Sequence, residues 1–561
     1  MHDLLIQNAQ LFDGTGSPAI TADLAIQGER IAAIGTKLGP ANVTIDATGL
    51  ALMPGIIDNH THFDAQATWD PTLSHSPAMG VTTAIIGNCG FTIAPCKPAD
   101  REMNMRNLTQ VEGMSLEVLR QGIKWDFETF PEYLAMLERQ GAATNIAAFI
   151  GHSSIRTWVM GPDAPKRAAT AAEIDTMRAM VQEGIQAGAV GFSTTTSPAH
   201  NGEGGLPMPS RMAADEELKA LTGALKDSDA LFMLTKGGQT KIDFLEEIAA
   251  ANGRPCVIAA LLHNATNPQG VFDDLDAIHA ANQRGHQLVG AISACPLSFD
   301  FTMRSPYPLE MMDAWKPALG LPLPALKAKL GEPAFRQRLR EELARGSKFR
   351  LFNGEWDRIR VVEVALEKNR HLEDKTFAEI CTAKGCDPFD FWFDLAMEED
   401  LATVFVALVL NSDEEAVGRM LNHPHSLISL SDAGAHLTFF NDAAFGLHVL
   451  GHWVRDTGKL SLPEAVRRLT GQPAQLFGIQ DRGVLRAGAF ADLLLFDPAT
   501  VGRGSKQRVF DLPGGAPRLA TPAHGVHGVW VNGRQVADAK GMVAQAPLAG
   551  RVLRSFGAVA A

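Results

Sequence analysis

Two histidines close an apolar stretch near the start of the chain. The segment "GLALMPGIIDNHTHFDAQ" places His60 and His62 one residue apart, with Asp58 two places before His60. Because side chains alternate along a strand, all three groups point to the same side. Two imidazoles on one face at a strand end suit a divalent metal. The alternative is a polar strand end with solvated histidines, so the rest of the chain must decide between the two.

Other residues able to act with these histidines follow similar apolar runs. We count eight runs rich in Val, Ile and Ala, and stretches with helical spacing lie between several of them. Eight buried strands alternating with helices predict a (β/α)₈ barrel, whose catalytic groups lie at the C-terminal ends of the strands. Polar groups do follow the runs, namely Cys89 in "GNCG", His152, Lys236, His263 and Asp432.

Several of these candidates also have a structural explanation. A free cysteine is usually a small buried hydrophobe, but the two flanking glycines favour a ligand role for Cys89. His263 is a metal-ligand candidate or a loop histidine. His152 is expected to be a hydrogen-bonded pocket or core residue, and His436 in "SDAGAH" is expected to line the pocket. The cations available for a substrate carboxylate are Arg304, Arg156, Arg455 and Lys236.

Composition limits the class of protein. The chain has 561 residues, of which 46% are hydrophobic and 20% charged, so it can bury a large core and still build a second or third structural unit. The formal net charge of −13, without basic clusters, argues against nucleic acid as a partner. No signal peptide or membrane span is recognisable. Six cysteines suit a reducing cytoplasm. The oligomeric state is not determined by the sequence.

The pattern of apolar and polar residues divides the chain into three parts. Residues 1–53 and 481–561 contain short alternating strands, and Asn532-Gly533 is typical of a type I′ hairpin. Neither end is large enough to bury a core alone, so both are expected to build one small β-sandwich. Residues 54–480 form the barrel. An inserted helical subdomain is expected at about 299–424, because 334–346 and 398–422 have helical patterns.

Three segments carry a resemblance to a known family. "MPGIIDNHTHFDAQATWDP", "GVTTAIIGNCGFTIAPC" and "GVLRAGAFADLLLFDPATV" resemble the N-acyl-D-amino-acid deacylases (D-aminoacylases) of the amidohydrolase superfamily. The resemblance implies a metal-bearing (β/α)₈ barrel with a small β-sandwich, and zinc-dependent hydrolysis of a linear amide. By motif, His60 and His62 match the family's HxH ligands, Cys89 its cysteine ligand, and Asp432 the aspartate after the eighth strand.

The chain departs from the family pattern at two strands. The fifth strand of the family ends in a histidine ligand, whereas this chain reads "LTKGG" with Lys236. The sixth offers a histidine in "SHLK", whereas "ALLHN" displaces His263. We keep Lys236 and His263 as further metal-ligand candidates, for one or two Zn²⁺ ions. No arginine follows "SD" until Arg455, where the family has a basic residue that grips the substrate carboxylate.

These residues predict metal-assisted amide hydrolysis of a small molecule. Zinc lowers the pKa of a bound water to about 7 and polarises a carbonyl. Asp432 is expected to take the proton of the attacking water and return it to the leaving nitrogen. One alternative is an amidohydrolase for a different amide, including a cyclic one. Another is a non-catalytic scaffold on the same fold, suggested by "LTKGG".

Overall fold

The computed structural model describes residues 1–557, except for 305, 311, 348–349, 351 and 438–439. The chain forms two compact units. The first unit contains Met1–Leu261, Asp274–Ala294 and Gly418–Ala561, and it holds most of the predicted site residues. The second unit contains Leu262–Asp273 and Cys295–Val417.

An eight-stranded parallel sheet is the centre of the first unit, and each strand corresponds to one of the apolar runs. The strands are β6 (Ile56–Asp58), β7 (Val81–Ile86), β8 (Asn145–Gly151), β9 (Gly191–Thr195), β10 (Leu231–Thr235), β11 (Cys256–Leu261), β12 (Leu288–Ile292) and β16 (Ser426–Ile428). Neighbours in this order are paired, and a parallel bridge from Thr61 to Ala433 joins the segments after β6 and β16. The first and last strands thus meet, which confirms the predicted barrel.

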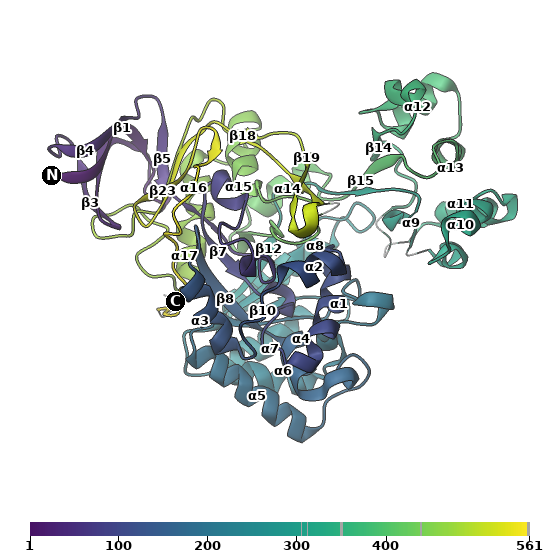
Figure 1. The fold of residues 1–561 in the computed structure, drawn as a ribbon, viewed down its shortest axis with the longest axis horizontal. Coiled ribbons are helices and arrows are strands. Elements are labelled where there is room, and N and C mark those ends of the chain that lie inside the picture. Colours follow the sequence, from purple (N-terminus) through teal and green to yellow (C-terminus); the bar gives the residue numbers. More distant parts are fainter. Residues whose placement is uncertain (305, 311, 348–349, 351, 438–439, 558–561) are drawn as a thin grey trace. The chain divides into compact units, whose positions relative to one another are not determined.

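Helices follow most of these strands and pack outside them (Figure 1). They are α1 (Arg101–Val111), α2 (Leu116–Gly122), α3 (Phe130–Gln140), α4 (His152–Met160), α5 (Ala171–Gln186), α6 (Asp215–Gly223), α7 (Ile242–Asn252), α8 (Gly270–Gln283), α15 (Phe445–His448), α16 (Leu462–Leu469) and α17 (Gly471–Leu476). Capping boxes at Thr129 and Thr170 fix where α3 and α5 begin. None of the helices in the described part of the chain combines the length and apolar character that crossing a bilayer requires.

The two ends of the chain share one nine-stranded mixed sheet. Its strands are β1 (His2–Leu11), β2 (Ile20–Gln27), β3 (Arg30–Gly35), β4 (Ala41–Asp46), β5 (Ala51–Pro54), β17 (Leu493–Phe496), β22 (Val526–Val531), β23 (Arg534–Asp538) and β24 (Gly541–Met542). The two halves join where β5 pairs antiparallel with β17, with Leu52 opposite Leu495. Both leucines belong to one buried apolar cluster that also contains Ile6 and Trp530. This confirms the β-sandwich built from both termini.

The hairpin predicted at Asn532-Gly533 connects β22 and β23. Both residues have positive φ, 47° and 76°, as a type I′ turn requires. Smaller pairs of strands complete this end of the chain, namely β18 (Gly502–Arg503) with β21 (Ala523–His524), and β19 (Gln507–Leu512) with β20 (Ala516–Ala520).

The second unit is mainly helical but also contains a sheet. Its helices are α9 (Tyr307–Glu310), α10 (Leu323–Leu330), α11 (Pro333–Arg345), α12 (Phe377–Lys384) and α13 (Pro388–Glu398). An antiparallel sheet joins β13 (Leu297–Phe301), β15 (Val404–Leu410) and β14 (Ile359–Glu363). The helix predicted at 334–346 is confirmed by α11. The prediction at 398–422 is wrong for β15, because "VFVALVL" alternates buried and half-buried residues with the period of a strand. A helix, α14 (Glu414–Leu421), does follow it.

Candidate metal centre and active site

Four side chains with metal-binding atoms converge at the C-terminal ends of the barrel strands. His60 and His62 follow β6, Cys89 follows β7, and Asp432 follows β16. His60 Nε2 lies 3.2 Å from Asp432 Oδ1 and 3.5 Å from Cys89 Sγ. His62 Nε2 lies 3.7 Å from the same carboxylate oxygen and 3.9 Å from the same sulfur. The structure therefore brings together the four residues that the sequence singled out first.

The spacing of these atoms fits a tetrahedral zinc ion. Metal–ligand distances of about 2.0–2.3 Å in tetrahedral geometry place neighbouring ligand atoms roughly 3.3–3.8 Å apart. The four separations given above, from 3.2 to 3.9 Å, lie close to that interval. Nitrogen, sulfur and carboxylate oxygen are also the ligand types that zinc takes in proteins. The donor set thus fits the implied metal in both chemistry and size.

The segment between the two histidines explains why both rings face the same way. The Thr61 N–H and Oγ1 both donate to the Ile85 carbonyl of β7, at 3.1 and 2.8 Å. Thr61 is thereby turned toward the neighbouring strand, and His60 and His62 project to the opposite side. The backbone N–H of His62 donates to the Ala433 carbonyl at 2.8 Å, which ties the ligand segment to the loop that carries Asp432.

Cys89 is held by a tight left-handed turn. Its φ is 57°, and the neighbouring Gly90 has a φ of 76°. A Cβ at Gly90 would lie 2.9 Å from the Ser193 carbonyl oxygen, so the turn needs glycine there. The motif "GNCG" therefore forms a buried turn that directs the Cys89 thiol toward the other donors at the barrel mouth.

The loop after β16 also combines left-handed backbone with a close approach at a glycine. Asp432 and His436 both have positive φ, 46° and 54°. Between them, a Cβ at Gly434 would lie 2.7 Å from the backbone of His62. The loop thus packs directly on the ligand segment, and this close approach sets the position of the Asp432 carboxylate.

Burial shapes the electrostatics of the four donors. It raises the pKa of Asp432 to about 6 and lowers the pKa of His60 well below its usual range. It also raises the pKa of the Cys89 thiol. For His62, burial acts to lower the pKa, but the charge and hydrogen bonding of Glu112 and Cys89 together outweigh burial, and the pKa lies well above its usual range. A divalent cation among these groups favours the thiolate and carboxylate forms that burial disfavours.

A cavity of about 360 Å³ opens beside the donors. His200 and His436 line it together with the four donors, Phe91 and Thr235. Phe91 stacks on His62 with ring centroids 6.2 Å apart and meets His200 edge-on at 4.8 Å. His436, predicted to be a pocket residue, is therefore placed at the cavity. A pocket that combines an aromatic wall with a few convergent polar groups is typical of a small-molecule site.

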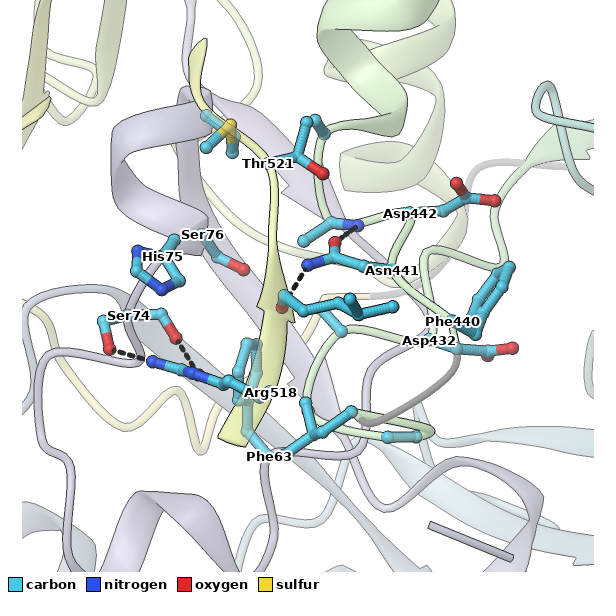
Figure 2. A pocket seen from close by; sticks show the side chains of 18 residues that line it. Phe63, Ser74, His75, Ser76, Asp432, Phe440, Asn441, Asp442, Arg518 and Thr521 are labelled. Carbon is cyan, nitrogen blue, oxygen red and sulfur yellow. Dashed lines mark hydrogen bonds between the residues drawn. The ribbon is translucent and has the colours of Figure 1, made fainter. Parts of the chain in front are cut away.

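A second cavity has a volume of about 420 Å³, and Figure 2 shows the side chains that line it. Asp432 belongs to the lining of both cavities. Figure 2 shows Arg518 reaching Ser74, whose carbonyl oxygen and hydroxyl accept hydrogen bonds of 2.9 Å from its guanidinium. Asn441 donates to the Leu519 carbonyl at 2.7 Å. Asp432 therefore borders two cavities.

Lys236 does not turn toward the donors. Its Nζ lies 2.9 Å from Asp274 Oδ2 on α8, and the cavity lining does not include it. Instead the preceding residue, Thr235 at the end of β10, has its Oγ1 3.1 Å from Cys89 Sγ. The role of Lys236 as a metal ligand therefore stays a prediction. It would require the ion pair between Lys236 and Asp274 to break.

His152 belongs to a fully buried network behind the barrel mouth. Its Nδ1 lies 2.8 Å from Thr194 Oγ1, and its Nε2 lies 2.8 Å from Glu217 Oε1. Arg156 pairs with the same Glu217 carboxylate, and all three charged or ionisable side chains are completely buried. Both ring nitrogens of His152 are engaged, so direct contact with a substrate would require one of these bonds to break.

His263 and Arg304 belong to the second unit. The backbone N–H of His263 donates to Asn411 Oδ1 at 2.8 Å. The Arg304 guanidinium donates to the Asp400 carbonyl at 3.3 Å. Both contacts lie within that unit, so the roles assigned to these two residues from the sequence stay predictions.

Two residues near the donors were not found from the sequence. His200 follows β9, and its Nδ1 lies 2.8 Å from Thr195 Oγ1. Glu112 follows α1, and its Oε1 lies 3.3 Å from His62 Nδ1. A His after the fourth apolar run was a usable signal for His200. Glu112 gave none, because a glutamate at the end of an amphipathic helix is ordinarily a solvated surface residue.

The chain belongs to the amidohydrolase family, whose model matches residues 43–537. It is similar over nearly its full length to enzymes that remove acyl groups from D-amino acids. A D-aminoacylase of Alcaligenes xylosoxydans xylosoxydans is 29% identical, with 98% of this chain and 97% of the relative covered. The N-acyl-D-aspartate deacylase of the same organism is 30% identical, with 98% and 95% covered. These relatives confirm the predicted family and the predicted class of enzyme, an amide hydrolase.

A solved relative supports the predicted metal. The N-acyl-D-glutamate deacylase from Bordetella bronchiseptica was solved with zinc and a phosphonate that mimics the tetrahedral intermediate. It is 26% identical, covers 99% of this chain and 100% of its own, and superposes with a TM-score of 0.66. The zinc cofactor predicted from the sequence is thus the metal that this relative carries.

Proposed function

We propose that this protein hydrolyses the amide bond of an N-acyl-D-amino acid with zinc held by His60, His62 and Cys89, and with Asp432 beside the metal as the group that transfers protons. The observation that carries the proposal is the convergence of these four donors in a barrel similar along its whole length to D-amino-acid deacylases. Zinc in such a site supplies Lewis acidity, which activates water and polarises a carbonyl. Thr235 and the Gly90 turn fix the sulfur of Cys89 for this purpose.

Asp432 has the place that proton transfer requires. Its side chain is 20% exposed and faces the cavity, whereas those of His60 and His62 are almost completely buried. A carboxylate at this point can take a proton from attacking water and deliver it to the leaving nitrogen. His200 and His436 are the polar groups placed to contact the substrate.

The test is hydrolysis of matched N-acetyl-D- and N-acetyl-L-amino acids by zinc-loaded enzyme. Acidic, basic and apolar side chains are included, because the relatives differ in the amino acid that their names specify. We expect release of free D-amino acid and little or no reaction with the L series. Hydrolysis of a cyclic amide in place of all linear substrates would contradict the proposal and favour the alternative amidohydrolase activity.

The same measurement addresses the scaffold alternative. A chain that binds zinc and hydrolyses neither linear nor cyclic amides would favour it. A cytoplasmic location and the lack of a nucleic-acid partner stay predictions, supported by the net charge of −13 and the low cysteine content.

A further inference from the structure

Glu112 is a buried carboxylate to which the proposed mechanism gives no role. It directly follows α1 and is 3% exposed. Neither of its carboxylate oxygens has a hydrogen-bond partner among the described residues. Burying a carboxylate without such partners is costly, so a glutamate at this position needs a charged or polar neighbour.

That neighbour is the metal-ligand candidate His62. Its Nδ1 lies 3.3 Å from Glu112 Oε1 and likewise lacks a hydrogen bond within the described structure. A carboxylate can only accept, so Nδ1 must carry the proton for the two groups to attract. The neutral ring then presents its lone pair at Nε2. That atom faces Cys89 and Asp432, at 3.9 and 3.7 Å.

We propose that Glu112 is a positioning residue, which holds His62 through Nδ1 and keeps Nε2 directed at the bound metal. The inference rests on the metal centre of the proposed function. A carboxylate behind a ligating imidazole fixes its tautomer and orientation and strengthens it as a ligand. Glu112 would give His62 this support from a helix end, far in sequence from the strand that carries the ligand.

The backbone hydrogen bonds of Glu112 do not involve its side chain, so the side chain can be changed without removing them. The Glu112 carbonyl accepts a 2.5 Å hydrogen bond from the His436 N–H, and its own N–H donates to the Leu108 carbonyl at 2.8 Å. Both bonds are independent of the side chain at position 112. Glu112→Gln also keeps the size of the residue and removes only its charge, so we expect the variant to fold.

The experiment measures zinc affinity by competition with a chromogenic chelator, on the full-length wild type and on Glu112→Gln. We expect binding about 10–100-fold weaker in the variant, the usual cost of losing such a partner. The matched control is Glu117→Gln, since Glu117 lies on the exposed face of the neighbouring α2. It should bind zinc as the wild type does. Equal affinity in wild type and Glu112→Gln would overturn the proposal.

Cobalt substitution separates positioning from a merely structural role. Visible absorption of the Co²⁺-loaded proteins reports the geometry at the metal, and we expect the Glu112→Gln bands to differ from wild type. Unchanged bands with unchanged affinity would leave Glu112 with a packing role only. If Glu112→Gln does not fold, Glu112→Asp replaces it. Weaker zinc binding by this shorter acid supports the proposal, and wild-type binding overturns it.

Zinc affinity and cobalt absorption are both measured without substrate, so this test is independent of the proposed reaction. A wild type that binds zinc but does not hydrolyse N-acyl-D-amino acids would contradict the proposed function and leave the role of Glu112 standing. A wild type that hydrolyses these substrates, with zinc affinity unaffected by Glu112→Gln, would contradict the role of Glu112 alone.

Discussion

At the scale of single residues, substitution of Asp432 distinguishes proton transfer from metal binding. In Asp432→Asn the metal keeps His60, His62 and Cys89, whose ligand atoms all lie within 4.8 Å of one another. The neutral amide cannot take up the proton of water. We therefore expect zinc content close to wild type and a kcat reduced by about 10²–10⁴-fold at saturating substrate. Elemental analysis and steady-state kinetics on the same preparation test this, and near wild-type turnover would contradict the role of Asp432.

Lys236 was predicted from the sequence as a possible metal ligand, and its substitution tests that prediction. Its ammonium pairs with Asp274, and Thr235 occupies the place beside Cys89. We expect Lys236→Ala to retain the zinc content of the wild type, measured on protein purified without chelator. A fall in zinc content in the variant would instead make Lys236 a ligand and indicate that it leaves Asp274 when metal binds.

At the scale of elements, the turn after β7 links backbone conformation to the metal centre. Gly90→Ala places a Cβ at a φ of 76° and 2.9 Å from the Ser193 carbonyl oxygen. The left-handed backbone alone costs about 1–2 kcal/mol, and the contact must also displace the turn that aims Cys89. We expect a lower melting temperature together with weaker zinc binding.

Gly253→Ala is the matched control for this turn. Gly253 ends α7 with a φ of 68°, and a Cβ there meets nothing within 4 Å. It carries the same backbone strain without the contact and lies away from the donors. It should lower the melting temperature and leave zinc affinity unchanged. Equal zinc affinity in both variants would show that the turn does not set the position of the thiol.

The elements also show how much could be predicted from sequence. Strands buried on both faces read as continuous apolar runs, so all eight barrel strands were predictable, and with them the positions of the candidate ligands that follow. The helix prediction fails at β15, because short apolar runs have no decisive period in the sequence. His200 was open to prediction as a histidine after the fourth apolar run, whereas Glu112 could not be placed, since its position depends on how the end of α1 folds over the barrel mouth. Such contacts have no local sequence signal.

At the scale of the whole first unit, one buried carboxylate connects the sandwich to the barrel. Asp492 precedes β17, and its Oδ1 accepts the Asn532 N–H of the β22–β23 hairpin at 2.7 Å. Its Oδ2 accepts a 3.0 Å hydrogen bond from Asn145, the first residue of β8, and pairs with the buried Arg482. The Asp492 side chain thereby links the sheet made by both termini to a barrel strand, and the Asn532 side chain adds a 2.9 Å hydrogen bond to Asn145 Oδ1.

Removing that side chain should therefore destabilise the barrel and the sandwich together. Asp492→Ala leaves the Arg482 guanidinium buried without its charge partner, a change that typically costs about 3–5 kcal/mol. We expect a lower denaturation midpoint, seen at the same denaturant concentration by far-UV circular dichroism and by loss of bound zinc. Asp175→Ala is the control, because Asp175 is 72% exposed and its pair with Arg178 contributes little. Loss of the sandwich with the metal centre still intact would show that the two parts unfold independently and that Asp492 stabilises only the sheet of the termini.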